Sequence, residues 1–445
     1  MKRLIEKDLK EWKNSENRKP LLVRGARQIG KTYVIRQFGK ESFDSVVEIN
    51  FEEMKEIKRA FEGDLTPSLI LRDLSARLKQ PIIPGKTLLF LDEIQACPNA
   101  LLSLRFFKEQ MPELHVIGGG SLLEFVLGDG RFSFPVGRIE YFYMQPLSFI
   151  EFLEAKGDSA SLTWIKEATP DQPIGAATHA SLIQSIKEYF IVGGMPEAIS
   201  FFIEKQQFLG LEQIHHNLLN VYENDFGKYP KSSQQKFMKM LFEAAPRLVG
   251  EHFKYAKIHP HAQARDYLES LQVLSQTGIL IQVFANASSG IPLATQKKEK
   301  KFKLLFLDIG LLPQVSESIL DAEDLALVNK GSLAEQFVGQ ELAAYIKPYM
   351  KPILYYWERE KKGGEAEVDY IIEVGQHIIP IEVKAGATGR LRSLKQFMTE
   401  KKSPFGLRIC QAPLSFEDNI LSVPFYMVRE IPRLVQWTLD NRPFA

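Results

Sequence analysis

Cysteine is scarce in this chain of 445 residues: Cys97 and Cys410 are the only two, and they lie far apart in the sequence. Two distant cysteines supply neither a zinc knuckle nor the disulfide framework of a small secreted domain. Long apolar runs are also missing, and the opening MKRLIEKDLKEW lacks the apolar centre of a signal peptide. We therefore expect a cytoplasmic protein without a membrane partner.

The chain also lacks an excess of either charge, since 56 Lys and Arg residues face 55 Asp and Glu residues. No whole-molecule field attracts nucleic acid, so any such binding requires a local patch. Internal repeats are absent, and the one biased segment is a lysine run, KKEKKFK, from Lys297 to Lys303. That run is either a phosphate contact or a solvated linker. The composition is otherwise that of a folded protein, and the length predicts about three domains.

A glycine-containing segment, GARQIGKT, follows the apolar stretch PLLVR and precedes helically spaced apolar residues. Its pattern is G-x-x-x-x-G-K-[ST], so we predict a phosphate loop between a strand and a helix. Lys31 is expected to reach the β- and γ-phosphates of ATP, and Thr32 to bind Mg²⁺. The predicted nucleotide-binding residues of this loop are Gly25, Ala26, Arg27, Gln28, Ile29, Gly30, Lys31 and Thr32.

A second motif, LLFLDEIQ, is an apolar strand that ends in two acids. A carboxylate at the end of a buried strand is costly unless it faces a cation, so Asp92 is the predicted Walker B partner of Mg²⁺ and ATP. Glu93 is the predicted catalytic residue that polarises the attacking water. SVVEINFEEM and ELHVIGGGSLLEF predict further buried strands, and the alternation with helices predicts a parallel sheet covered on both faces.

Two further residues carry open alternatives. Ser121, at the end of HVIGGGS, is either a sensor of the γ-phosphate or part of a glycine turn. Arg138 is either an arginine finger that reaches a phosphate in a neighbouring subunit or a surface arginine paired with an acid.

The middle of the chain predicts helices. Ser159 to Gly175 is rich in small and polar residues and is expected to be a loop, and GGMP around Gly194 is expected to break a long helix. Two helical patterns then precede a predicted hairpin around ANASSG, as in a winged helix; Tyr267, Leu268, Leu271 and Leu274 are expected on one helix face. Acids flank Arg265 on that helix, so DNA binding and a structural role both stay open.

Near the end, EVDYIIEVGQHIIPIEVKAG predicts a strand hairpin that carries Asp369, Glu382 and Lys384. Alternation places Glu382 and Lys384 on the same face of one strand. Two carboxylates there can hold Mg²⁺, while the lysine stabilises charge that develops on a phosphodiester. The competing interpretation is that all three are exposed strand-end residues. The histidine pairs of the chain have no HExxH or cysteine context, so no zinc is predicted.

Several segments together, GARQIGKT, LLFLDEIQ, LRFFKEQMPELHVIGGGSLLEF, PVGRIEYFYMQPLSFIEF and YFIVGGMPEA, resemble the prokaryotic AAA-type P-loop ATPases that carry a C-terminal domain of unknown function. The resemblance extends over essentially the whole chain. It implies an α/β protein with an ASCE-type ATPase core, a central winged helix and a C-terminal restriction-endonuclease-like, PD-(D/E)XK domain. Many members have TGSS where this chain has GGGS. The resemblance also implies Glu335 as a further acid of the metal site.

The predicted domains are an AAA-type P-loop domain (1–155), a helical lid or linker (156–232), a winged helix (233–295) and a nuclease-like domain (296–445). The predicted metal ligands are Thr32, Asp92, Glu335, Asp369 and Glu382. We expect an ATPase that couples its nucleotide state to a DNA-directed nuclease-like domain. The alternative is a regulatory or scaffold ATPase whose inactive nuclease fold only binds DNA or a protein partner. Homo-oligomers are a further expected partner class.

Overall fold

The first sheet is built from the N-terminal third of the chain, in a computed structural model that describes residues 1–120, 137–228, 232–260, 263–315, 331–359, 366–387 and 389–442. Its five strands are all parallel and lie in the order β2-β3-β4-β1-β5. This confirms the predicted parallel sheet. The strands are β1 (Leu21–Arg24), β2 (Ser45–Asn50), β3 (Thr87–Asp92), β4 (His115–Gly119) and β5 (Glu140–Tyr143).

Helices cover both faces of this sheet, and every residue of its central strand β3 is buried. The covering helices are α1 (Ile5–Lys13), α2 (Lys31–Ser42), α3 (Pro67–Leu78) and α4 (Pro98–Gln110). The last strand, β5, ends at Tyr143, and α6 begins at Phe149.

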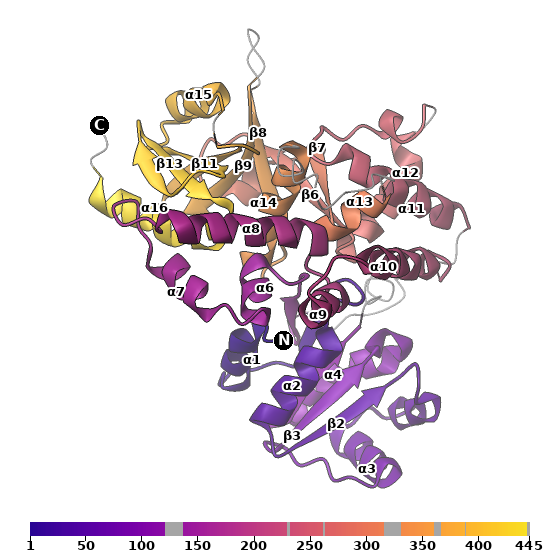
Figure 1. Cartoon of the computed structure of the whole chain (residues 1–445). Helices are drawn as coiled ribbons and strands as arrows, with labels where there is room; N and C mark the ends of the chain where they lie inside the picture. The colour runs from indigo at the N-terminus through magenta and orange to yellow at the C-terminus, as the bar shows by residue number, and fades with distance from the viewer. Residues whose placement is uncertain are drawn as a thin grey trace.

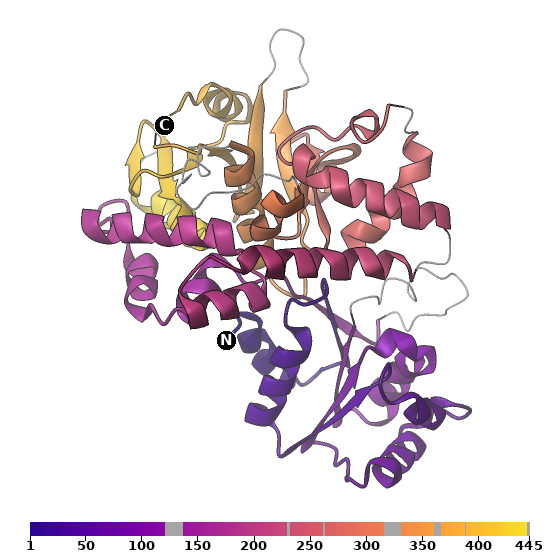
Figure 2. The same cartoon turned by 45° about the vertical axis from the view of Figure 1, so that its right-hand side comes forward.

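A layer of helices lies between the first sheet and the second, with α8 and α10 crossing the molecule in both views (Figure 1, Figure 2). The layer and the helices that follow it are α6 (Phe149–Ala155), α7 (Ser159–Glu167), α8 (Ala176–Val192), α9 (Pro196–Lys205), α10 (Leu211–Phe226), α11 (Ser232–Ala244) and α12 (Ala264–Gln276). Helix α8 ends at Val192, which confirms the helix break expected at Gly193 and Gly194.

Two local expectations for this region were wrong. The segment predicted as a loop begins with helix α7, because the Asp158 side chain caps the helix by accepting a hydrogen bond from the Ser161 N–H at 3.1 Å. On α12, Leu268 is 49% exposed although Tyr267 and Leu271 are buried, so the apolar face is narrower than predicted.

The second sheet is mixed and has eight strands in the order β12-β13-β11-β10-β9-β8-β6-β7. The strands are β6 (Leu280–Asn286), β7 (Lys297–Phe306), β8 (Leu354–Glu358), β9 (Glu367–Val374), β10 (His377–Val383), β11 (Gly406–Cys410), β12 (Ser415–Glu417) and β13 (Ile420–Pro424). Its helices are α13 (Leu312–Val315), α14 (Gly331–Tyr345), α15 (Arg392–Lys401) and α16 (Ile431–Asn441). The predicted hairpin of β9 and β10 is confirmed.

The predicted wing differs from the observed strands. β6 pairs with β7 on one side and with β8 on the other, so this hairpin belongs to the eight-stranded sheet. A separate winged helix is therefore not confirmed. The lysine run is the first part of strand β7 and not a linker, and the run ends in the buried residue Lys303.

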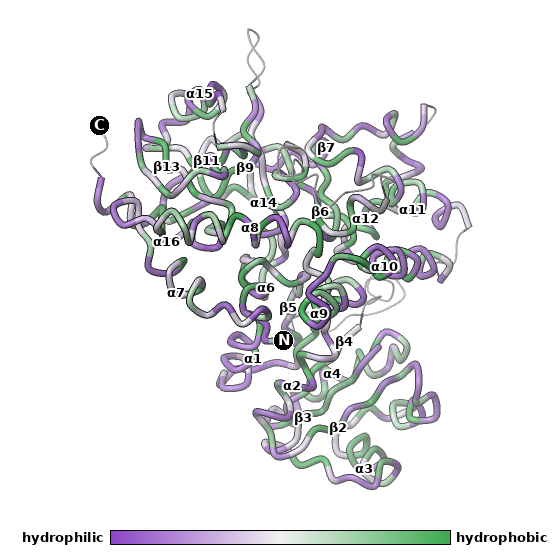
Figure 3. Tube along the Cα trace, in the orientation of Figure 1, coloured by the Kyte–Doolittle hydropathy of each residue, from purple (hydrophilic) through white to green (hydrophobic). Residues whose placement is uncertain are grey.

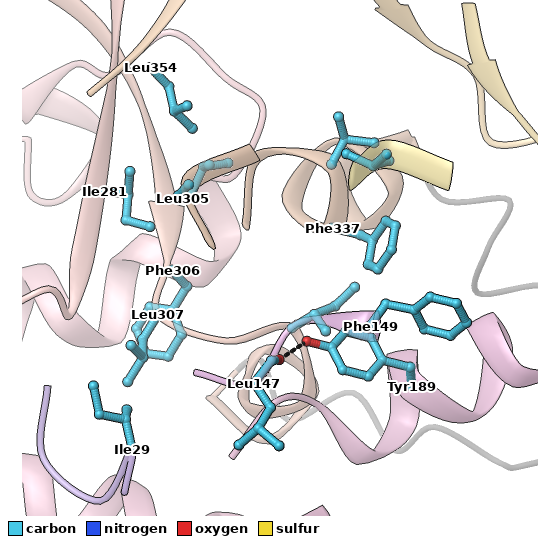
Figure 4. Close-up of a cluster of buried hydrophobic side chains, with 14 of the residues drawn as sticks. Ile29, Leu147, Phe149, Tyr189, Ile281, Leu305, Phe306, Leu307, Phe337 and Leu354 are labelled. Atoms are coloured by element: carbon cyan, nitrogen blue, oxygen red, sulfur yellow. Dashed lines mark hydrogen bonds between the residues drawn. The ribbon is translucent and has the colours of Figure 1, made fainter. Parts of the chain in front are cut away.

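One hydrophobic core extends through both sheets and the helices between them, from Ile5 to Val435. Hydrophobic stretches run through the intervening helices as well as the strands (Figure 3). Ile29 of the phosphate loop lies in the same cluster as Phe306 and Leu307 of the second half of the chain (Figure 4). In the described part of the chain, none of the helices has the length and apolar character that a membrane crossing requires.

Candidate functional site

The phosphate loop connects β1 to α2, as the sequence predicts. Two glycines fix its path: Gly25 has φ +143° and Gly30 has φ +90°. A β-carbon at Gly25 would lie 2.3 Å from the carbonyl oxygen of Met144. The loop therefore runs against backbone that leaves no room for a side chain at Gly25.

Lys31 and Thr32 begin helix α2. The Lys31 ammonium donates hydrogen bonds to the carbonyl oxygens of Gly25 at 2.9 Å and Ala26 at 2.6 Å. The Thr32 hydroxyl donates to the Asp92 carboxylate at 3.2 Å. The structure thus brings together the predicted Walker A hydroxyl and the predicted Walker B acid, which are the oxygen ligands that Mg²⁺ prefers.

Burial shifts both charged groups toward their neutral forms. It lowers the pKa of the Lys31 ammonium to about 8, against the attraction of Glu93 and Asp92. Burial and the charge of Glu93 raise the pKa of Asp92 to about 6. Both charges are costly without a ligand, so a phosphate facing Lys31 and a cation facing Asp92 would each favour the ionised form.

Glu93 follows the end of β3 in the left-handed region, with φ +47°. Its N–H donates to the Asp92 carboxylate at 3.1 Å, and its own carboxylate accepts a hydrogen bond from the Gln95 amide at 2.6 Å. This turn separates the two carboxylates, so Asp92 points to Thr32 while Gln95 holds Glu93. Gln95 is a positioning residue that the sequence analysis did not identify, although it lies within the quoted LLFLDEIQ.

Other elements hold the loop from outside. The guanidinium of buried Arg3 donates to the carbonyl oxygen of Ile29 at 2.8 Å, and it pairs with Glu151 of α6. The Tyr222 hydroxyl of α10 donates to the carbonyl oxygen of Arg27 at 2.6 Å. No local sequence signal identifies these supports, since they come from segments far from the loop.

The structure does not test one of the remaining ATPase candidates and places the other away from the loop. Ser121 lies outside the described residues. Arg138 pairs with Glu109 at 3.0 Å and has a side chain that is 53% exposed. Arg138 precedes β5, whose first residue pairs with the first residue of β1. It therefore lies at the N-terminal ends of these parallel strands, whereas the phosphate loop follows the C-terminal end of β1. Its role toward a neighbouring subunit stays a prediction.

The second candidate site lies on the eight-stranded sheet. Asp369 of β9 accepts a hydrogen bond from the Val383 N–H of β10 at 2.7 Å, which places it beside the neighbouring residue Glu382. The Lys384 ammonium donates to Glu382 at 2.6 Å. The structure therefore brings together the three residues of the predicted hairpin site.

Glu335 joins this site from α14 through Lys303, which belongs to the lysine run predicted as either a phosphate contact or a solvated linker. The Lys303 ammonium, with a side chain only 2% exposed, lies 2.8 Å from Glu335 and 2.5 Å from Glu367. Glu367 also pairs with His252. Lys303 and Glu367 are thus members of the acidic site that the sequence pattern missed.

The acids of this site carry more negative charge than their surroundings stabilise. Burial raises the pKa of Glu335 and of Glu382, and the charge of Asp369 is the next cause for both. Burial alone would lower the pKa of Lys303, but attraction to Glu335, Asp369 and Glu367 raises it. An added cation would therefore relieve repulsion among these acids.

Two observations bear on whether a metal fits here. Within the described ranges, no three His, Cys, Asp or Glu side chains are already arranged around a common metal position. Among the described residues, none donates a hydrogen bond to the buried Oε2 of Glu382, and Glu382 is only 7% exposed. A buried carboxylate oxygen without a donor is costly, and a cation would satisfy it. The donor set suits Mg²⁺, although small side-chain movements are needed to form the site.

Comparison with protein families divides the chain into three matches. Residues 17–153 match the family described as AAA domain. Residues 183–322 match a domain of unknown function, DUF8612, and residues 330–426 match another, DUF4143. None of the curated proteins matches the chain.

Solved structures give distant likenesses. The Orc1 protein of Aeropyrum pernix in complex with DNA is 13% identical with a TM-score of 0.29, and the match covers 71% of this chain and 93% of that one. A signal transduction ATPase with numerous domains from Pyrococcus horikoshii is 14% identical with a TM-score of 0.27, over 76% of this chain and 47% of that one. TM-scores this low do not establish a shared overall fold.

Proposed function

Because residues 17–153 match the family described as AAA domain, we propose that the protein has an AAA-type P-loop ATPase domain that binds and hydrolyses ATP with Mg²⁺. The hydrogen bond between Thr32 and Asp92 is the observation that carries this proposal. It joins the second residue of α2 to the last residue of β3. These two side chains would hold Mg²⁺, which stabilises negative charge on the phosphates when it is bound.

The other residues of the loop supply binding and orientation. Lys31 exchanges the carbonyl oxygens of Gly25 and Ala26 for phosphate oxygens, and the N-terminus of α2 faces the same phosphates. Glu93, held by Gln95, orients water and accepts its proton during hydrolysis.

Two substitutions test the ATPase proposal. Lys31→Ala removes the only ammonium of the loop, so we expect ATP affinity to fall at least about tenfold. Glu93→Gln keeps the shape but removes the base, so we expect ATP to bind and turnover to fall about 100-fold. Steady-state phosphate release and equilibrium binding of a fluorescent ATP analogue measure the two effects.

The matched control is Lys40→Ala, since Lys40 is an exposed lysine on the same helix α2. Its binding and turnover should equal those of the wild type. Turnover that is unchanged in Glu93→Gln would show that Glu93 is not the base. Affinity that is unchanged in Lys31→Ala would contradict the site itself.

A second function is proposed for the sheet of the C-terminal half: Mg²⁺-dependent cleavage of a phosphodiester in DNA, under the control of the ATPase. The juxtaposition of Asp369, Glu382 and Lys384 favours it, together with the unpartnered oxygen of Glu382. Here Lys384 would stabilise the charge that develops on the phosphate. The alternative is that this site binds DNA or a protein partner without cutting.

Cleavage of supercoiled plasmid in Mg²⁺ or Mn²⁺, with and without ATP, tests this second function. We expect nicking or cutting by the wild type and a loss of at least about 100-fold in Asp369→Ala, because a metal ligand is removed. Glu417→Ala is the control, since Glu417 is an exposed acid on β12 of the same sheet. A wild-type protein that leaves plasmid and linear DNA intact under all four conditions would favour the binding-only alternative.

A further inference from the structure

Strand β7 places an ammonium group inside the acidic site. Lys303 is 1% exposed, and its Nζ lies within ion-pair distance of both Glu335 and Glu367. Backbone pairing fixes the position further, because Val283 of β6 lies opposite Lys303 and His252 forms an isolated bridge to it. The ammonium is therefore held by the sheet and is not on a mobile surface chain.

An ordinary buried ion pair does not account for this arrangement. A single pair would match one lysine with one carboxylate, whereas Lys303 and Lys384 face four acids, Glu335, Glu367, Asp369 and Glu382. Of these acids, Glu367 also pairs with His252. Removing so many charges from water is unfavourable, and replacement of a buried pair by apolar groups is often neutral. The imbalance points to a site built for more positive charge than the two lysines provide.

Glu335 is the residue for which the Lys303 ammonium and a metal ion would compete. Its Oε1 accepts from Lys303, and its Oε2 lies where a β-carbon on Gly250 would approach it to 2.8 Å. The carboxylate is thus confined on one side by backbone and occupied on the other by the ammonium. A metal ion bound to Glu335 would lie beside the Lys303 ammonium, and repulsion between the two positive charges opposes binding of both at once.

We propose that Lys303 is the resident cation of the acidic site and that it competes with a divalent metal for Glu335. The inference rests on the second proposed function for the identity of the metal ligands. In this arrangement the chain keeps its own acids paired when no metal is bound. Metal binding then requires the ammonium to leave Glu335, while Glu367 remains available to hold it.

Metal titration of the full-length protein tests the competition without any DNA. Free Mn²⁺ is measured by electron paramagnetic resonance, without nucleotide, in the wild type and in Lys303→Met. We expect Lys303→Met to bind Mn²⁺ at least about tenfold more tightly, because the competing charge is gone. Adding Asp369→Asn to Lys303→Met should abolish the gained binding and so assign it to this site.

The control is Lys301→Met, because Lys301 lies two residues earlier on β7, has a side chain that is 57% exposed and pairs with Glu358. Its Mn²⁺ affinity should match that of the wild type. If Lys303→Met does not fold, Lys303→Gln removes the same positive charge but keeps an amide that can donate to Glu335, and it too should raise the affinity.

Equal or weaker Mn²⁺ binding in folded Lys303→Met would overturn the proposal, since Lys303 would then support the metal site instead of opposing it. Plasmid cleavage reports on the second proposed function separately. Tighter metal binding without cleavage would retain the competition and exclude the nuclease activity, so the two failures are distinguishable.

Discussion

At the scale of single residues, the charges that matter are those the fold has removed from water. Glu341 of α14 is 1% exposed and accepts hydrogen bonds from the Phe149 N–H at 3.0 Å and from the Tyr345 hydroxyl. Burial raises its pKa to about 8 in spite of both donors. The folded chain therefore holds a proton on Glu341 at pH values where the unfolded chain does not.

This proton makes stability depend on pH. A raised pKa in the folded state contributes stability that is present below the unfolded pKa and is lost as pH rises through about 8. We expect the wild type to lose on the order of 1–3 kcal/mol relative to Glu341→Gln between pH 5 and pH 9, because the amide does not titrate. Urea unfolding across that pH range measures the difference.

Glu212→Gln is the control for this comparison, since the Glu212 side chain is 75% exposed. Its stability should follow the wild type at every pH. Parallel curves for wild type and Glu341→Gln would contradict a proton on Glu341.

At the scale of elements, short sequence motifs predicted those elements whose structure depends on residues close together in the chain. The phosphate loop could be predicted because glycine, lysine and threonine occupy fixed positions after a strand. The hairpin of β9 and β10 could be predicted from alternation and from Gly375, which adopts φ +60° at the turn. In both cases the residues that form the sequence motif are also the residues that determine the local backbone structure.

Elements fixed by distant partners could not be predicted in this way. The lysine run was predicted to be a phosphate contact or a solvated linker, yet Lys303 is buried because Glu335, 32 positions later, supplies its counter-charge. The wing was predicted as a separate hairpin, but pairing of β6 with β8 joins it to a larger sheet. No window of sequence around Lys303 contains the residues that decide its environment.

At the scale of the whole molecule, the predicted domain divisions do not interrupt the packing. A single core includes residues from the first sheet, the intervening helices and the second sheet. We therefore expect the two halves to unfold together, because separating them would expose apolar surface on both sides. The predicted boundaries at 155, 232 and 295 stay predictions about sequence units.

Tryptophan fluorescence can test whether the two halves unfold cooperatively. Trp12 lies in the shared core, and Trp357 lies in a smaller cluster of the second sheet. Two variants, each keeping one of these tryptophans with the other three changed to phenylalanine, should unfold in urea at the same midpoint. ATPase activity equal to that of the wild type is the control for intact folding. Midpoints that are clearly separated would show that the halves unfold independently.

The hydrogen bond from Tyr222 to the carbonyl oxygen of Arg27 has a consequence for the order of events during synthesis. The two residues are 195 positions apart. A growing chain thus exposes the phosphate loop long before the ribosome has released the helix that supports it. Tight nucleotide binding is then expected late in translation. Its onset would show that the middle of the chain has folded against the loop.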